Sequence, residues 1–273
     1  MNQPSTTEFK EQFQKANLTD RLLFQHSLRP IHIIKPLIEG ILRTDVGDIN
    51  FLHDEMTQSV SVTSKDTRYD LLLQDVEGTL YDVEMENKGA NIYERVDYYQ
   101  AMLAVGSLEK GVSYKNLPKR KVIVISNFDP YGKGDYIYVI EPKVVKYPEL
   151  DSGMKSQVIY LNLKGKHGWD ELTPEVQEFV ILAKDTTAET ASRLTTPFAK
   201  DLFEQVTYVK NRVKQEEDTK MGFITDIMDA KDEGMAIALE IMTLFRKGLS
   251  INEIAAKTGA SIDYIMQLLG EKA

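Results

Sequence analysis

The residues best suited to chemistry are three acids within one short segment, RYDLLLQDVEGTLYDVEMEN, residues 68–87. Asp70, Glu84 and Glu86 carry carboxylates, and carboxylate oxygens are the ligands that Mg²⁺ and Mn²⁺ prefer. A divalent cation held by two or three such groups can activate a water molecule for hydrolysis. We therefore ask whether the chain brings these three acids together.

The pairing register of a β-hairpin decides whether the acids converge. Two apolar-rich runs flank Val76-Glu77-Gly78, and the common three-residue loop places glycine in its left-handed third position. With that loop, Asp75 pairs with Thr79 and Asp70 pairs with Glu84. A two-residue loop would instead pair Asp70 with a methionine and mix apolar with acidic residues on each face, so the pattern favours the three-residue loop.

This register divides the hairpin into an apolar face and an acidic face. The apolar face, expected to contact the core, contains Leu71, Leu73, Tyr81, Val83 and Met85. The opposite face contains Asp70, Asp82, Glu84, Glu86 and Lys88.

The acids on this face repel one another unless something neutralises them. Directly opposed side chains such as Asp70 and Glu84 have Cβ atoms ~5 Å apart, and Glu84 and Glu86 lie ~6.6 Å apart along the strand. A metal ion would remove the repulsion. On spacing alone, however, a charged strand face exposed to water is the more ordinary explanation, and a metal site needs independent support.

The segments around the hairpin predict its surroundings. Residues 8–27 are typical of one amphipathic helix or a broken pair, with Thr19-Asp20 as the cap before the second half. The segment after Trp169 is helical and begins with a cap at Thr173, and the many charges of residues 199–220 indicate a solvated helix. Further helices are expected at 31–43 and 91–109, a short strand within 48–56, and strands at 121–128, 136–142 and 156–165. Helices, then a sheet with one inserted helix, then more helices indicate an α/β or α+β core with a C-terminal helical extension.

Several of these segments together resemble a known family. The string RYDLLLQDVEGTLYDVEMENKG, followed by ERVDYYQAML, is similar to the PD-(D/E)XK nuclease family transposases, also called recombination-promoting nucleases. The likeness extends to TDRLLF, KVIVISNFDPYGKGDYIYVI, QVIYLNLKG and, near the C-terminus, LFRKGLSINEIAAKTGASIDYI. It covers most of the chain, and it rests on the combination of these short motifs.

The resemblance implies a metal-dependent DNA endonuclease with a restriction-endonuclease-like mixed sheet flanked by helices. Asp70 and Glu84 would be metal ligands, and Glu86 would occupy the third motif position. That position holds lysine in the superfamily and usually glutamine in this group, so Glu86 is a departure. It would ligate the metal, orient the water or mark altered activity, and Lys88 would supply a positive charge unless it is a surface lysine.

The resemblance also implies a mechanism, which is phosphodiester hydrolysis assisted by Mg²⁺ or Mn²⁺. Arg95 and Gln100, on the helix that follows the hairpin, would then contact phosphate. Packing and surface pairing explain both residues equally well.

We expect three regions along the chain: a nuclease-like core at 1–170, a helical connector at 171–227 and a helix-turn-helix-like unit at 228–273. Ser250 and Glu253 form a capping box in the last unit. Its presumed recognition helix, IDYIMQLLG, has no Lys or Arg. Because DNA-reading helices use such residues, we favour a structural or homo-oligomerisation role for these helices.

Composition limits the alternatives. The 273 residues carry a net charge of −9, which argues against a protein that simply coats DNA, although a local basic groove or a metal site would still engage it. The chain has no Cys, which fits a reducing cytoplasm, and no stretch approaches the ~20 apolar residues of a membrane span. The sequence therefore predicts a nuclease linked to recombination or mobile elements; the alternative is a catalytically degenerate relative that acts as an interaction or oligomerisation module.

Overall fold

The fold is described from a computed structural model for residues 6–52, 57–58, 67–108, 111–215, 244 and 249–258. The chain divides into two compact units, one of residues 1–58 and 67–214 and the other of residues 59–66 and 215–273. The first unit contains every element on which the candidate site depends.

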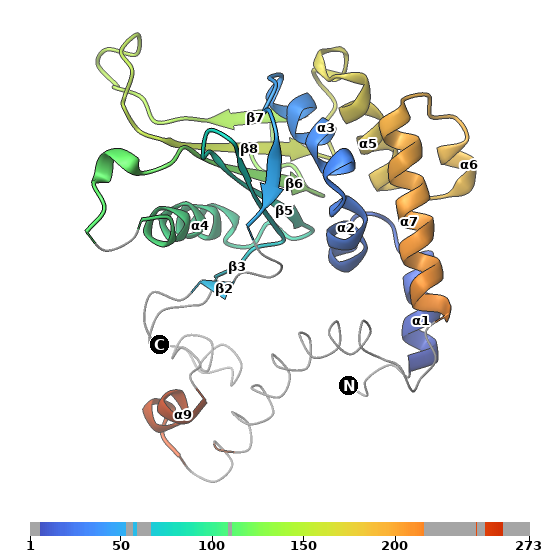
Figure 1. The fold of residues 1–273 in the computed structure, drawn as a ribbon. Helices are drawn as coiled ribbons and strands as arrows, with labels where there is room; N and C mark the ends of the chain where they lie inside the picture. The colour runs from blue at the N-terminus through green and yellow to red at the C-terminus, as the bar shows by residue number, and fades with distance from the viewer. Residues whose placement is uncertain are drawn as a thin grey trace. The chain divides into compact units, whose positions relative to one another are not determined.

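The first unit combines a mixed sheet with helices (Figure 1). Its helices are α1 (Thr6–Lys15), α2 (Arg21–Leu28), α3 (Ile31–Leu42), α4 (Ile92–Gly106), α5 (Pro174–Lys184), α6 (Ala188–Ala191) and α7 (Pro197–Gln215), with short 3₁₀ turns η1 (Tyr114–Asn116) and η2 (Trp169–Glu171). Its strands are β1 (Ile49–Phe51), β2 (Thr57–Gln58), β3 (Thr67–Arg68), β4 (Leu71–Asp75), β5 (Leu80–Glu86), β6 (Arg120–Ser126), β7 (Ile137–Ile140) and β8 (Ser156–Asn162).

Six strands form one sheet in the order β1-β4-β5-β6-β8-β7, and β2 pairs separately with β3. The hairpin β4-β5 is antiparallel, β5 and β8 flank β6 in parallel, and β7 returns antiparallel at the edge. Helix α4 makes the crossover between parallel strands β5 and β6 and packs against β6. This is the mixed sheet with flanking helices that the sequence predicts.

The predicted hairpin register is confirmed. Leu71 pairs with Val83 and Leu73 with Tyr81. The loop is closed by the Gly78 amide, which donates to the Asp75 carbonyl at 3.0 Å, and Gly78 has a φ of +86°. Glycine adopts this left-handed conformation without the steric penalty of a Cβ, so the turn chemistry sets the register.

The acidic face of the hairpin is not exposed to water, which corrects the simpler explanation of its charges. Asp82 is 0% exposed and Glu84 2% exposed. Paired residues of parallel strands face the same side, and the partners of these acids are Val122 and Val124. Those valines pack in one cluster with residues of α4 such as Val96, so α4 covers this face.

The apolar face is buried too, as predicted, and all of β5 is therefore inside the fold. Helix α2 packs against β5, and α3 packs against β1 and α5. A strand buried on both faces normally reads as a continuous apolar run, and the acids of β5 break that pattern. Acids retained in such a strand point to a role other than solubility.

The N-terminal segment forms the broken helix pair rather than one helix. The Asp20 carboxylate accepts hydrogen bonds from the amides of Leu22 and Leu23, so it caps α2 as the sequence predicts. Thr173 caps α5 in the same way, through the amide of Val176.

Helix α7 corrects one expectation, because it is more than a solvated charged helix. Its apolar stripe is buried and comprises Phe198, Leu202, Val206, Val209 and Val213.

In the second unit, the structure describes helix α9 (Ile251–Thr258). The Ser250 and Glu253 capping box is confirmed: the Glu253 carboxylate accepts from the Ser250 amide at 2.8 Å, and the Ser250 hydroxyl accepts from the Glu253 amide at 3.4 Å. The predicted helix over 262–269 lies outside the described residues, and the three-region division of the chain stays a prediction. None of the helices described here is long and apolar enough to cross a membrane.

Candidate active site

Asp70 lies directly before β4 and is held by three groups. Its Oδ1 accepts from Nε of Arg21 at 2.5 Å and from Nε2 of Gln25 at 2.9 Å, and its Oδ2 accepts from the Met85 amide at 3.0 Å. Arg21 and Gln25 come from α2, 49 and 45 residues away in sequence. The side chain of Asp70 is 1% exposed, so this carboxylate is buried and closely positioned.

Glu84 joins Asp70 directly, as the register predicts. Its Oε1 accepts the Asp70 backbone amide at 2.9 Å. Burial, followed by the neighbouring charges of Asp82 and Asp70, raises the pKa of Glu84 well above its usual value. Burial also raises the pKa of Asp70, although Arg21 opposes this shift. The two carboxyls therefore lie together in a buried site in which Arg21 compensates part of their charge.

Asp82 is the acid that sequence reasoning left out of the site. It lies two residues before Glu84 on β5, so the two side chains are on the same face of the strand. Neither of its carboxylate oxygens has a hydrogen-bond partner among the described residues. Burial raises the pKa of Asp82 to about 8, with a further contribution from the charge of Asp70. Strand alternation already placed Asp82 beside Glu84, and only its burial shows that it is unusual.

Glu86 is engaged by a cation rather than free. Arg95 of α4 donates to both of its carboxylate oxygens, from Nη1 to Oε2 at 3.1 Å and from Nη2 to Oε1. Arg95 also donates to the Tyr99 hydroxyl at 3.4 Å. Each arginine therefore forms an ion pair with one acid: Arg21 with Asp70, and Arg95 with Glu86.

Lys88 and Gln100, the other two predicted site residues, lie outside the carboxylate cluster. Strand β5 ends at Glu86, so strand alternation does not carry Lys88 onto the acidic face, and Lys88 lies exposed in the following turn. Gln100 donates through Nε2 to the Gln157 carbonyl at 2.7 Å, which ties α4 to β8. Contact of Lys88, Arg95 or Gln100 with substrate stays a hypothesis.

The donor chemistry of these acids suits a hard divalent cation, because every available ligand atom is a carboxylate oxygen. The oxygens of Asp82 lie next to Glu84 and have no hydrogen-bond partner among the described residues, so a cation bound here would stabilise them. The side-chain arrangement itself is not a closed ligand set: within the described ranges, no three His, Cys, Asp or Glu side chains are grouped closely enough to hold an ion. Asp70 and Glu86 instead make ion pairs with Arg21 and Arg95.

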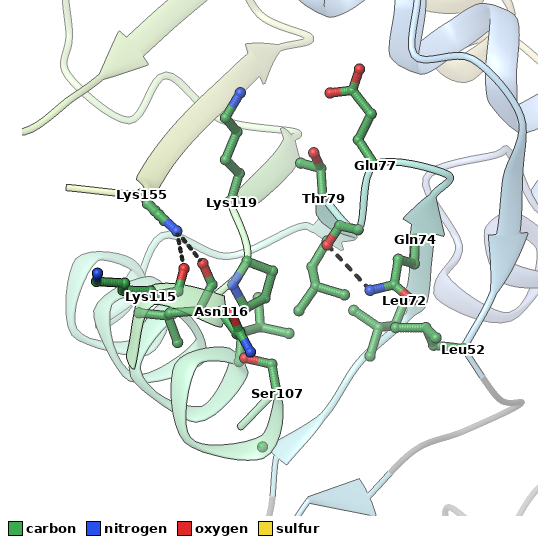
Figure 2. A pocket seen from close by; sticks show the side chains of 16 residues that line it. Leu52, Leu72, Gln74, Glu77, Thr79, Ser107, Lys115, Asn116, Lys119 and Lys155 are labelled. Atoms are coloured by element: carbon green, nitrogen blue, oxygen red, sulfur yellow. Dashed lines mark hydrogen bonds between the residues drawn. The ribbon is translucent and has the colours of Figure 1, made fainter. Parts of the chain in front are cut away.

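A second feature lies at the other end of the strands, where a cavity of about 770 Å³ opens beside the starts of β5, β6 and β8 (Figure 2). Three lysines line it: Lys115, Lys119 and Lys155. Lys155 is anchored by donating to the carbonyls of Lys115 at 3.1 Å and Leu117 at 2.7 Å. In Figure 2 the side chain of Lys119 is seen between those of Lys155 and Glu77, and Glu77 is the one acid among the described residues that line the cavity. This is a local basic surface on an acidic protein.

The mixed sheet and the buried Asp-Glu pair on its central hairpin define a nuclease-like α/β domain. Comparison with protein families agrees: the family model for the PD-(D/E)XK nuclease family transposases matches residues 21–189. The chain belongs to this family, which supports a nuclease- or transposase-related role. A search of the curated proteins and a search of the solved structures each find no match.

Proposed function

We propose that this protein is a metal-dependent DNA endonuclease that hydrolyses phosphodiester bonds in recombination or in the movement of mobile elements. One observation carries the proposal most directly. The buried carboxyls of Asp70 and Glu84 are linked through the Asp70 amide, and both lie within residues 21–189, which the nuclease family model matches.

In this proposal Asp70 and Glu84 would hold Mg²⁺ or Mn²⁺, and the metal would supply an activated water and charge stabilisation at the scissile phosphate. Gln25 and the Met85 amide orient the Asp70 carboxylate. Arg21 balances its charge until a cation binds. Glu86 and Lys88 remain proposed catalytic groups at the third motif position and beyond it, with Arg95 positioning Glu86.

DNA is the proposed partner, and the lysine-lined cavity supports it. Phosphate neutralisation by Lys and Arg provides most of the sequence-independent affinity for DNA. Lys115 and Lys119 offer this chemistry at the far end of the same strands, in a chain whose net charge is −9. We also place the protein in the cytoplasm, since a chain without Cys suits a reducing compartment.

The proposal is tested by cleavage of supercoiled plasmid with Mg²⁺ or Mn²⁺ and with EDTA. We expect wild type to nick the plasmid only with metal, and Asp70→Asn and Glu84→Gln to lose at least a hundredfold in rate. Glu204→Gln, which removes an exposed acid of α7, is the matched control and should cleave normally. Equal cleavage by wild type and Asp70→Asn would remove the catalytic assignment.

The alternative is a catalytically degenerate nuclease fold that acts as an interaction or oligomerisation module, through the C-terminal helices among others. The ion pair of Glu86 with Arg95, at a position where this family usually carries glutamine, favours it. Glu86→Gln separates the two functions. Cleavage that appears only in Glu86→Gln would show that the natural chain has lost activity, whereas cleavage by wild type would exclude the degenerate module.

A further inference from the structure

A pocket of about 360 Å³ lies between α4 and strands β7 and β8, on the face of the sheet that carries the acids. We call it the tyrosine pocket. The lining residues on which the argument depends are Tyr93, Asp97, Gln100, Tyr131, Gln157 and Tyr160.

Aromatic rings dominate one wall of this pocket. The ring of Tyr131 lies 5.4 Å from that of Tyr93 and 5.7 Å from that of Tyr160, measured between centroids, and it meets Tyr160 edge-on at 88°. Tyr93 is 47% and Tyr131 41% exposed, so aromatic surface is open to a ligand. Flat surfaces of this kind bind other flat rings by stacking.

The turn that carries Tyr131 is held in place by one carboxylate. Asp129 accepts hydrogen bonds from the amides of Tyr131, Gly132 and Gly134 and from the Tyr138 hydroxyl, at 2.7–3.2 Å. The Tyr93 hydroxyl donates to the Pro130 carbonyl in the same turn. The wall is therefore formed before any ligand arrives.

The charged groups of the pocket are carboxylates, which accept hydrogen bonds. Asp97 and Glu141 contribute carboxylates to the lining, and neither Lys nor Arg is among the lining residues. The Oε1 atoms of Gln100 and Gln157 are buried in its walls without a hydrogen-bond partner among the described residues. Such a pocket disfavours phosphate and suits a neutral ring that carries N–H donors.

The tyrosine pocket is close to the carboxylate pair. Glu84 pairs with Val124, and Val124 pairs with Tyr160 on the next strand, so the three side chains form one row across the sheet. Two strand spacings separate Glu84 from Tyr160 by about 10 Å. That is about the axial length of three nucleotides of one strand in duplex DNA, at 3.4 Å of helix axis each.

We propose that the tyrosine pocket binds an unpaired nucleobase of the strand that reaches the carboxylate site. The base stacks on Tyr131 and Tyr93, and its exocyclic amino group donates to the exposed carboxylate of Asp97. The inference rests on the proposed nuclease function for its substrate class. It adds that the protein takes up a base outside a double helix, with a preference for bases that carry an amino group.

The test compares the binding of single-stranded 10-mers of equal charge. It is done in EDTA, which removes the divalent metal and so prevents metal-dependent cleavage. Fluorescence anisotropy is measured for labelled dC, dT and abasic 10-mers. Wild type should bind the dC strand about five- to a hundredfold more tightly than the abasic strand, the range expected for loss of base stacking. Tyr131→Ala should lose this difference, whereas Tyr131→Phe, which keeps the ring, should retain it.

Two further variants keep the result interpretable. Asp97→Asn changes an exposed helix residue and should reduce the preference for dC over dT without abolishing binding. Tyr208→Ala removes a 58% exposed tyrosine of α7 outside the pocket and should change nothing. Equal binding of dC and abasic strands, equal behaviour of Tyr131→Ala and wild type, or no binding at all would overturn the inference.

The outcomes also separate the two proposals. Tyr131-dependent base binding by a protein that never cleaves plasmid would leave the tyrosine pocket in place and remove the nuclease function. Metal-dependent cleavage with base-independent binding would leave the nuclease function in place and remove the base-binding role of the tyrosine pocket.

Discussion

At the scale of residues, the site is a set of buried carboxyls whose charges are only partly balanced. Arg21 and Arg95 each pair with one acid, Asp70 and Glu86, whereas the oxygens of Asp82 have no hydrogen-bond partner among the described residues. Removing one partner of a buried ion pair leaves an uncompensated charge, and this costs more than the loss of an exposed pair.

The ion pair of Arg21 with Asp70 gives a prediction that links stability to metal. Arg21→Gln should lower the free energy of unfolding by about 1–3 kcal/mol in EDTA, because a buried carboxylate loses its cation. Mg²⁺ or Mn²⁺ should then stabilise the variant more than wild type, because a ligand that binds only the folded state adds stability. Urea denaturation with and without metal measures both effects.

The control for this change is Arg193→Gln. Its ion pair with Glu189 is exposed, with side chains 71% and 78% accessible, and should contribute no more than about 1 kcal/mol. Equal stabilisation of wild type and Arg21→Gln by metal would contradict the proposal that Arg21 balances the charge of Asp70 until a metal ion binds.

At the scale of elements, a tight turn positions the candidate site, and a single carboxylate joins two of the later helices. The turn at Gly78 sets the β4-β5 register, and through it the meeting of Asp70 with Glu84. Further along the chain, Glu178 of α5 holds the start of α7. Its carboxylate accepts from the amide and hydroxyl of Thr195 and Thr196, at 2.5–2.9 Å.

Gly78→Val should lower the free energy of unfolding by about 1–2 kcal/mol, since a residue with a Cβ is strained at this positive φ. A Cβ here would meet only the Gln74 amide nitrogen at 3.8 Å, so conformation and not crowding is the cause. Gly78→Asn should lose less, because Asn adopts left-handed conformations more readily. Thermal or urea unfolding compares the two, and equal losses would refute the backbone explanation.

Glu178→Gln should show a stability deficit that depends on pH. Partial burial opposes ionisation, but the hydrogen bonds from Thr196 and Thr195 outweigh it and lower the pKa of Glu178. The ionised side chain therefore stabilises the fold above the pKa of an unfolded glutamate, about 4.3, and this contribution is lost as the pH falls through the folded value. Urea unfolding at pH 7, 5 and 3.5 should show the gap to wild type closing on acidification, with Glu175→Gln of the same helix as control.

At the scale of the whole molecule, charge is distributed unevenly. A chain of net charge −9 presents lysines around one cavity at one end of its sheet and buried acids on the central hairpin. An acidic protein of this kind engages DNA through a local surface, and such binding carries a defined salt dependence.

The double change Lys115→Gln and Lys119→Gln should weaken duplex binding in EDTA and reduce the slope of log affinity against log salt by up to about 2, close to 0.9 per phosphate contact. Lys200→Gln with Lys214→Gln, on α7, alters net charge equally and is the matched control. Identical slopes for the two double variants would show that the lysine cavity does not contact DNA.

The features that the sequence predicted well are those decided by neighbours in the chain. Gly78 and the separation of the acids from Leu71, Leu73, Tyr81 and Val83 determine the hairpin register. Asp20, Thr173 and Ser250 mark helix starts through hydrogen bonds to amides two or three residues away. Each depends on local conformation, so a single sequence carries enough information to predict it.

Tertiary structure decided the rest. The acids of the hairpin are buried only because α4 covers their face, and Asp70 is held by Arg21 from 49 residues away. The tyrosine pocket likewise joins α4, the turn at Tyr131 and β8. Composition and spacing alone indicated that Asp70 and Glu84 meet. Whether they meet in water or in a buried site with partly balanced charges depends on contacts between distant segments, which local patterns do not encode.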